Sequence, residues 1–580
     1  MFKVHTSNPT FQRESGYTKG KYMNTIKGQL TLRGLVIGGI GCIILTAASA
    51  YTALKMGALP WPIIFAAIIS LFFLKALGNT SLNEANVTHT IMSAGSMVAG
   101  GLAFTIPGIW ILTGENPVEW WQMLIVALAG TILGLVVTAF IRRHFIEEAH
   151  LEFPIGESAA QTLIAGDSGG KTGAKLFGSL GIAGLYTALR DWFAVLPAMF
   201  FSNVTIPGIT FGIYNSPMML AVGFLVGTGA VIAWFAGAVF ANFGLIVGGS
   251  SLGIWDIATA QGIVSSLGMG VMMGCGIGVI VKNILPKLPS IAKGMIGSGN
   301  NKGISGKAMG GAVAFILAAV ALVICFTLQF GPLPSIIVVL MVWIATAMSA
   351  QSVGQTGIDP MEIFGLIVLL FCAAIADLPA MQLFFIAGIV AVACGLAGDV
   401  MNDFHAGYVL HTNPTAQWLG QAFGGIIGAI VATVVMVLLV QAYGPTAFGT
   451  QGSFVAAQAS VVATMISGIP SIPAFVIGLV AGLILHCVKA PAMMIGLGIY
   501  LPFYMSFTAF LGAIAKVVYD AITKARRRKK QEEGLDDEGA QVLKKKQDES
   551  GLVVASGLLG GESIVGVLVA LSAVVMGMGA

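Results

Sequence analysis

The chain has 580 residues, of which 56% are hydrophobic and only 9% are charged, and its mean hydropathy is +0.90. Soluble domains carry roughly 25% charged residues, so most of this chain cannot face water. The net charge is only +4 and nothing resembles a nucleic-acid-binding basic face, which excludes nucleic acid as a partner. We therefore expect an integral membrane protein.

Apolar stretches of about 20 residues, the length that a membrane-spanning helix needs, follow one another along the chain. The clear candidates are 33–54, 60–78, 86–112, 121–143, 175–200, 217–241, 263–282, 308–330, 334–350, 361–377, 382–402, 418–442, 472–488 and 492–519. Shorter or broken pieces lie at 154–166, 243–260, 454–468 and 551–580. The predicted fold class is an all-α polytopic integral membrane protein with about 14–16 transmembrane helices, some broken or re-entrant.

Clusters of Lys and Arg occur in four of the connections, at 19–33, 142–143, 282–307 and 524–530. Cytoplasmic loops are enriched in these residues, so we expect all four clusters on the cytoplasmic side of the cell membrane, together with the N-terminus. The side of the C-terminus stays open. The number of clear spans between the second and third clusters has the wrong parity, so 154–166 or 243–260 must complete a crossing.

This pattern divides the chain into a cytoplasmic arm (1–30), a first transmembrane half (31–285), a cytoplasmic loop (286–307), a second transmembrane half (308–523), a charged linker (524–550) and a closing membrane segment (551–580). The linker mixes basic and acidic residues with few apolar ones, which predicts a flexible cytoplasmic connection. Gly-Glu-Ser occurs at 156–158 and again at 561–563. We interpret the two copies as marks of internal repeats with broken helices; the alternative is chance, because Gly and Ser are abundant.

Carboxylates inside apolar segments are the strongest functional signal, because a charge in lipid is expensive and normally faces the protein interior or a water-filled cavity. Glu157 and Glu562 are of this kind. Asp399 and Asp403 lie four residues apart, so on a helix they share a face, where joint ionisation is disfavoured. The pair is therefore a candidate proton site; the alternative is that Asp403 caps a helix beside a solvated His405.

Other polar residues interrupt the first half. Glu84 and His89 open the third stretch, where Glu84 could merely cap a helix and His89 is the better candidate for the transport pathway. Arg190 could bind a substrate carboxylate, or it could anchor its helix at the membrane interface. Asp191 follows it directly, and neighbours on an α-helix diverge by about 100°, so the two need not pair.

Two further residues lie in breaks between apolar runs. Asp256 sits in the broken segment 243–260, where it could line a cavity. Gln355 belongs to the polar break at 351–360, whose backbone could hydrogen-bond an extended peptide if it is buried at membrane depth. A plain external loop is the alternative for this break.

Four sets of motifs carry a family resemblance: AYTALKMG at 50–57 with PWP at 60–62, LEFPIG at 151–156, GDVMNDF at 398–404, and SGL at 556–558 with GES at 561–563. Through them nearly the whole chain resembles the oligopeptide transporter family, which includes the yellow stripe-like metal-chelate transporters. The resemblance implies proton-coupled importers built from repeated helical units. His405 stands where this resemblance leads us to expect lysine, and histidine can change its charge near neutral pH.

The predicted function is a proton-coupled symporter that imports small oligopeptides, with import of metal chelates of siderophore or nicotianamine type as the alternative. The predicted proton-coupling residues are Asp399, Asp403, Glu157, Glu562 and His405. The predicted substrate-binding residues are Arg190, Asp191, Glu84, His89, Gln355 and Asp256.

The expected partners are these substrates and the lipid bilayer, and a homo-oligomer is left open. No HExxH sequence and no Walker loop occur, so we expect neither a protein-bound metal nor direct use of ATP; the proton gradient would be the driving force. A channel and an intramembrane hydrolase are distant alternatives. Deep carboxylates on broken helices favour a gated carrier, and we do not expect an enzyme.

Overall fold

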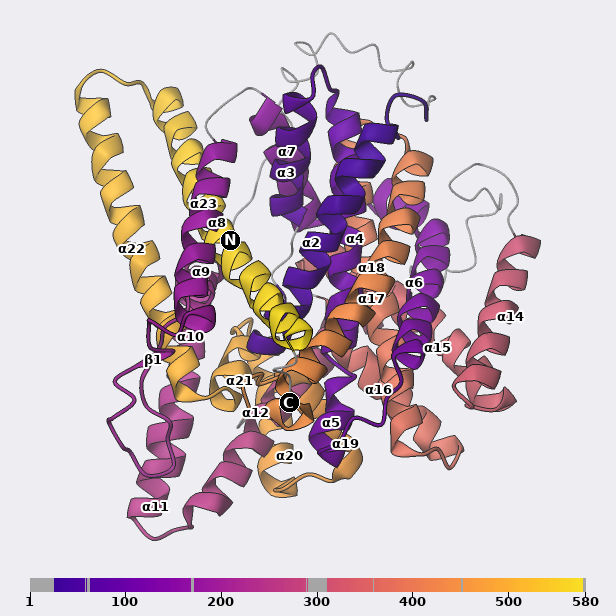
Figure 1. The fold of residues 1–580 in the computed structure, drawn as a ribbon, viewed down its shortest axis with the longest axis vertical. Helices are drawn as coiled ribbons and strands as arrows, with labels where there is room; N and C mark the ends of the chain where they lie inside the picture. Colours follow the sequence, from indigo (N-terminus) through magenta and orange to yellow (C-terminus); the bar gives the residue numbers. More distant parts are fainter. Residues whose placement is uncertain are drawn as a thin grey trace.

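The fold is known from a computed structural model that describes residues 26–57, 59, 63–167, 172–287, 289, 310–357, 359–449 and 452–576. Most of the predicted arm (1–30) and most of the predicted loop (286–307) lie outside these residues. In the described part, ten helices are long and apolar enough to cross a membrane, and six shorter apolar helices accompany them. Helices dominate the whole molecule (Figure 1), which confirms the all-α polytopic class.

The first half of the chain is a run of α-helices interrupted by π-helical turns (η). These are α2 (Leu32–Met56), α3 (Ile63–Ala76), α4 (Leu82–Ala103), α5 (Pro107–Thr113), α6 (Trp120–Arg142), η1 (Arg143–Glu148), α7 (Pro154–Asp167), α8 (Thr172–Thr187), η2 (Ala188–Trp192), α9 (Pro217–Val226), α10 (Thr228–Val239), η3 (Phe240–Gly248), α11 (Gly249–Ser251), α12 (Ile257–Val279) and η4 (Ile280–Ile284), followed by the 3-10 turn η5 (Leu285–Lys287). Two short antiparallel strands, β1 (Met199–Phe200) and β2 (Ile213–Tyr214), precede α9 and pair Met199 with Tyr214.

The second half continues with the same kind of helices. They are α14 (Gly310–Thr327), α15 (Pro332–Thr356), α16 (Met361–Ile375), α17 (Ala380–Leu410), α18 (Pro414–Tyr443), the 3-10 turn η6 (Pro445–Ala447), α19 (Ala457–Ser467), α20 (Ile472–Cys487), α21 (Ala492–Tyr500), α22 (Phe503–Glu532) and α23 (Asp537–Val575). Helix α14 lies at one edge of the molecule and α22 at the opposite edge (Figure 1).

Helix α17 is the buried axis of the bundle, packed against α4, α6, α7, α15 and α16. Small residues on its neighbours permit this burial, because they let helix backbones approach closely. A Cβ added at Gly101 of α4 or Gly130 of α6 would lie 2.6 Å or 2.7 Å from atoms of α17. Glycines at these crossings therefore explain how most of this 31-residue helix can be buried.

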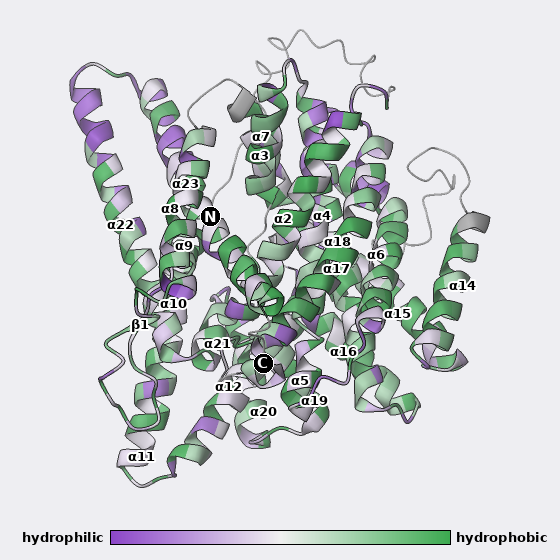
Figure 2. Cartoon of the chain, viewed as in Figure 1, coloured by the Kyte–Doolittle hydropathy of each residue, from purple (hydrophilic) through white to green (hydrophobic). Residues whose placement is uncertain are grey.

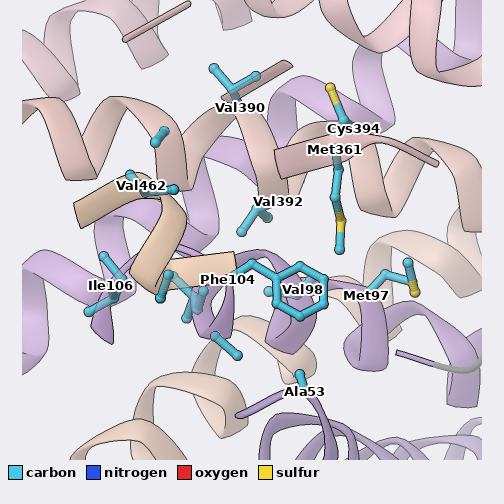
Figure 3. Packing of buried hydrophobic residues seen from close by; sticks show 14 of the residues in the cluster. Ala53, Met97, Val98, Phe104, Ile106, Met361, Val390, Val392, Cys394 and Val462 are labelled. Carbon is cyan, nitrogen blue, oxygen red and sulfur yellow. The ribbon is translucent and has the colours of Figure 1, made fainter. Parts of the chain in front are cut away.

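The main hydrophobic core forms where α2, α4, α16, α17 and α19 meet. Figure 3 shows Val98 of α4 near Val392 of α17 and Met361 of α16, with Ala53 of α2 close by. All four side chains are almost fully buried. Since the contacts join segments some 300 residues apart in sequence, this core holds the two halves of the chain together.

Several predicted spans are divided in the structure. The span predicted at 217–241 breaks at Gly227, whose φ of 96° and ψ of 141° end α9 and start α10. The span predicted at 492–519 breaks at Leu501, which is extended because Pro502 follows it. The predictions of single helices at these two places are therefore wrong.

Two further boundaries differ from the predictions. The predicted segment 243–260 is shared between η3, α11 and the start of α12, with a turn at 252–256, so it is not one crossing. The stretch predicted at 175–200 is helical only to Trp192, and Met199 already belongs to β1. Hydrophobicity marks apolar length in both places, but it does not reveal where the chain turns.

The predicted flexible linker (524–550) is mostly helical, with a turn between α22 and α23. Exposed pairs four residues apart, such as Arg528 with Glu532, support α22, and Asp536 caps α23 through a 2.9 Å hydrogen bond from Gly539 N. Charged residues of this kind are also good helix formers, which explains the helical structure of the linker. Figure 2 shows hydrophilic colour concentrated toward the tip of this hairpin.

Candidate functional site

A fully buried polar cluster joins α4 to α17. Its members are His89 and Ser93 of α4 and Asp399 and Asp403 of α17, all with 0% exposure. His89 Nε2 lies 2.9 Å from Asp403 Oδ1. Ser93 Oγ lies 2.9 Å from Asp399 Oδ2 and 3.0 Å from Asp403 Oδ2, so both carboxyl groups lie on the same side of α17, as their spacing predicts.

Helix α18 completes this cluster with two amides that are also four residues apart. Gln421 Nε2 donates to Asp403 Oδ2, and Gln417 Nε2 donates to the Asp403 carbonyl at 2.7 Å. Asp399 Oδ1 and His89 Nδ1 are buried and have no hydrogen-bond partner among the described residues. The sequence analysis missed Gln421, although its i, i+4 spacing from Gln417 within an apolar run is a signal that could have found it.

The geometry of the His89–Asp399–Asp403 cluster suits a bound proton. The Ser93 hydroxyl has one hydrogen but faces two carboxyl oxygens, so an added proton on one carboxyl group would remove the repulsion between them. With both carboxylates ionised and His89 protonated, the cluster would still bury one net negative charge. A buried charge without compensation is energetically costly, and binding of a proton would remove this charge from the cluster.

A second buried cluster surrounds Glu562 of α23 at the start of α9. Glu562 Oε1 accepts a hydrogen bond from Arg190 Nη2 at 2.9 Å, and its Oε2 accepts from Met218 N and Ser216 Oγ, both at 2.8 Å. Free backbone N–H groups and the helix dipole make a helix N-terminus a good site for a carboxylate. Glu562, a predicted proton-coupling residue, therefore lies in a cradle formed by two other elements.

Arg190 has its donors occupied within this second cluster. Its Nε and Nη2 atoms contact the two carboxylate oxygens of Asp191 at 2.6 Å and 2.7 Å, and its Nη1 donates to the Asn215 carbonyl. The two adjacent residues pair within the π-helical turn η2. The structure thus joins the predicted substrate residues Arg190 and Asp191 to Glu562.

Glu157 and His405 form a third, more open contact between α7 and α17. His405 Nε2 lies 3.4 Å from Glu157 Oε2, and Gln161 Nε2 donates to Glu157 Oε1 at 3.0 Å. The Glu157 side chain is 46% exposed, unlike the buried Glu562. Gly156 N donates to Asn402 Oδ1 at 3.1 Å, which fixes the start of α7 against α17.

A cavity of about 230 Å³ lies between α2, α3, α7, α9 and α23. Its lining is mostly apolar, and the polar side chains in it are Ser49, Thr52, Ser158 and Ser556. Ser158 directly follows Glu157, and Thr52 Oγ1 lies 2.7 Å from Oγ of Ser563, the neighbour of Glu562. The two Gly-Glu-Ser segments therefore flank one cavity that mixes apolar walls with hydroxyl groups.

The remaining predicted site residues lie outside these clusters. Glu84 ties the first turn of α4 to α2, because Arg33 Nε and Nη2 contact its carboxylate at 2.7 Å and 2.5 Å. Asp256 is exposed and caps α12, where a 2.7 Å hydrogen bond from Thr259 N lowers the pKa of Asp256 below its ordinary value. Gln355 is partly buried in the last turn of α15.

A partly buried acidic pair near the start of α16 was not predicted as a site. Asp359 Oδ1 accepts from Ser349 Oγ at 2.6 Å, and its Oδ2 has no partner among the described residues. Glu362, three residues later, is 6% exposed. Asp359 belongs to the polar break that was noted at 351–360. Glu362 could have been found as an acidic residue in the first turn of an apolar helix.

Fold and clusters together define a multi-pass membrane transporter. The sequence model of the OPT oligopeptide transporter protein family matches residues 29–283 and 304–573, so the chain belongs to that family. A relative from Haemophilus influenzae, named "Putative oligopeptide transporter", is 24% identical, with the match covering 90% of this chain and 92% of the relative. The resemblance seen in the sequence is confirmed, and members of this family are transporters, not enzymes.

Proposed function

We propose that this transporter is a proton-coupled symporter that imports small oligopeptides. The observation that carries the proposal is the His89–Asp399–Asp403 cluster, in which two acidic side chains and one imidazole are completely enclosed. A carrier driven by protons needs titratable groups within the membrane that can be exposed to each side in turn. The cluster supplies such groups at the centre of the bundle, on its most buried helix.

The cluster would couple proton binding to helix movement through its cross-helix contacts. When the acidic pair binds a proton, the attraction between Asp403 and His89 weakens. The contact between α4 and α17 is then less stable, so the two helices can shift relative to each other. The cavity between α2, α7 and α23 would hold the substrate while these helices rearrange. Glycine breaks such as Gly227 would let short helices move separately.

A peptide is the substrate best supported by the observations. The printed name of the relative and the description of the family both refer to oligopeptides. Hydroxyl groups in a mostly apolar cavity suit peptide amides and apolar side chains together. The described residues contain no group of three or more His, Cys, Asp and Glu side chains that could hold a metal ion, but a metal chelate would bring its own ligands.

The test is uptake into proteoliposomes that contain the purified protein. A mixed pool of di- to hexapeptides is supplied with and without an inward proton gradient, and internal peptides are identified by mass spectrometry. We expect intact peptides to accumulate with the gradient and to leak out when a protonophore is added. Uptake that ignores the gradient would contradict proton coupling. If iron chelates accumulate in the same vesicles while peptides do not, the substrate assignment is wrong and the metal-chelate alternative replaces it.

A further inference from the structure

Lys55, in the last turn of α2, points its ammonium group into an aromatic cage. Its Nζ lies 4.8 Å from the ring centroid of Phe454 and 5.8 Å from those of Tyr51 and Tyr214. It also donates a 2.7 Å hydrogen bond to the Ser453 carbonyl. The structure therefore directs the charge of Lys55 toward aromatic rings of the protein.

The cage is held by a meeting of two helix ends. Helix α2 stops at Gly57, and Ala456 N, at the start of α19, donates to the Leu54 carbonyl at 2.8 Å. Gly57 has a φ of 65°, and a Cβ there would lie 2.4 Å from Ala457 Cβ, so only glycine fits the junction. Discontinuous helices of this kind are where secondary transporters build substrate sites.

Among the described residues Lys55 has no carboxylate in direct contact, whereas its basic neighbour Arg190 is paired with two. Arg190, whose guanidinium lies 5.6 Å from the same Tyr214 ring, is neutralised by Asp191 and Glu562. No carboxylate oxygen of the described residues comes within 4.0 Å of Lys55 Nζ. An ammonium group has three donors, and Lys55 Nζ makes one hydrogen bond to the described residues, so it has donors left for a ligand.

The position of Lys55 continues the lining of the cavity between α2, α7 and α23. Thr52 and Leu59 both line that cavity, and Lys55 is one helical turn beyond Thr52. The side chain is partly exposed, so its ammonium group is not sealed from solvent. Tyr51, Tyr214 and Phe454 supply flat apolar walls beside the charge, which suit the organic group that carries a carboxylate.

We propose that Lys55 binds a carboxylate of the transported substrate, in place of the Arg190 that the sequence suggested. This inference rests on the proposed peptide transport and deepens it. A substrate carboxylate has two sources, the peptide C-terminus and an acidic side chain. The positive charge of Lys55 predicts a preference for anionic over neutral substrates.

The experiment compares three tripeptides in proteoliposomes: free Ala-Ala-Ala, its C-terminal amide, and the amide of Ala-Glu-Ala. The proteins tested are wild type, Lys55→Gln, Lys55→Arg and, as a matched control, Lys282→Gln. Lys282 is a suitable control because its Nζ also donates to a backbone carbonyl, that of Cys487, at 2.6 Å. We expect wild type and Lys282→Gln to prefer the free peptide to its amide by about tenfold, as for a charge-assisted hydrogen bond. Lys55→Gln should lose this preference and Lys55→Arg should keep part of it.

The readout is the ratio between peptides, which is independent of how much protein folds. Equal uptake of free and amidated peptides by wild type would overturn the proposal for Lys55 while leaving peptide transport intact. A ratio unchanged in Lys55→Gln would overturn it as well. Uptake of Ala-Glu-Ala amide at the level of the free peptide would show that a side-chain carboxylate suffices. If wild type takes up none of the three peptides, the proposed function itself fails and this inference falls with it.

Discussion

At the scale of single residues, the acidic pair of α17 is held by partners from two other helices. Asp403 contacts His89 of α4 and Gln421 of α18, whereas Asp399 contacts only Ser93 and keeps one oxygen without a partner. The two carboxyl groups are therefore unequal in their surroundings. Protonation of Asp403 would therefore directly change contacts with both α4 and α18.

We expect Asp403→Asn to abolish accumulation driven by a proton gradient. An amide cannot bind the proton, and it keeps the size of the carboxyl group, so folding should survive. Uptake in proteoliposomes should fall to the level seen without a gradient, while exchange of labelled for unlabelled peptide persists. Asp520→Asn is the control, because Asp520 pairs with Lys516 on an exposed part of α22. Gradient-driven uptake by Asp403→Asn at the wild-type level would rule out the pair as the proton site.

Asp256 should behave as a helix cap. It is exposed at the start of α12, and the hydrogen bond from Thr259 N lowers its pKa, so it is ionised at neutral pH. Its stabilising effect is then present above the ordinary aspartate pKa and is lost as pH falls through the lowered value. Asp256→Ser, which replaces one capping side chain with another, should leave peptide uptake unchanged. A change in substrate preference would restore Asp256 as a substrate residue.

At the scale of helices, glycine contacts set how closely neighbours can pack. A Cβ at Gly428 of α18 would lie 2.2 Å from the Gly95 Cα of α4, so these helices touch through their backbones. This crossing lies on the helix pair that carries His89 and Gln421. Its closeness therefore positions the side chains around Asp403.

Gly428→Ala should separate α4 from α18 and destabilise the protein by about 1–3 kcal/mol, the usual cost of overpacking. Thermal stability in detergent and the amount of monodisperse protein both measure this effect. Gly181→Ala is the matched control, because nothing lies within 4 Å of a Cβ at Gly181 and alanine favours helix. Equal stability of the two variants would show that the α4–α18 contact can relax.

The sequence predicted helix type well and helix partners poorly. Length and hydropathy located α17, and the spacing of Asp399 and Asp403 placed them on one face. Nothing local indicated that His89, some 300 residues away, contacts Asp403, because that pairing depends on how helices cross. The sequence left open whether Arg190 and Asp191 pair, and the structure shows that they do, within the π-helical turn η2.

At the scale of the whole molecule, α23 forms one wall of the cavity and α2 forms another. Thr52 of α2 and Ser563 of α23 nevertheless touch beside it, with their hydroxyl oxygens 2.7 Å apart. A carrier that exposes its site alternately must move elements on the two sides of the cavity relative to each other. The Thr52–Ser563 contact is a place where such movement would be detected.

A disulfide across this contact should arrest transport. With Thr52→Cys and Ser563→Cys combined, oxidation would join α2 to α23, since the two side chains are close enough for a disulfide. We expect uptake to stop on oxidation and to return on reduction. Each single variant, oxidised in the same way, controls for the native cysteines. Full uptake by a completely crosslinked protein would mean that α2 and α23 move as one body.

The arrangement around Arg190 also has an evolutionary consequence. Arg190 pairs with two carboxylates, of which Glu562 is fully buried and Asp191 is 26% exposed. Loss of Glu562 leaves a neutral Arg190–Asp191 pair, whereas loss of Arg190 first leaves two negative charges side by side. Related sequences should therefore include chains that keep the arginine without the glutamate, and scarcely any that keep the glutamate without the arginine. The charges of the three residues therefore predict that the glutamate is lost before the arginine during evolution.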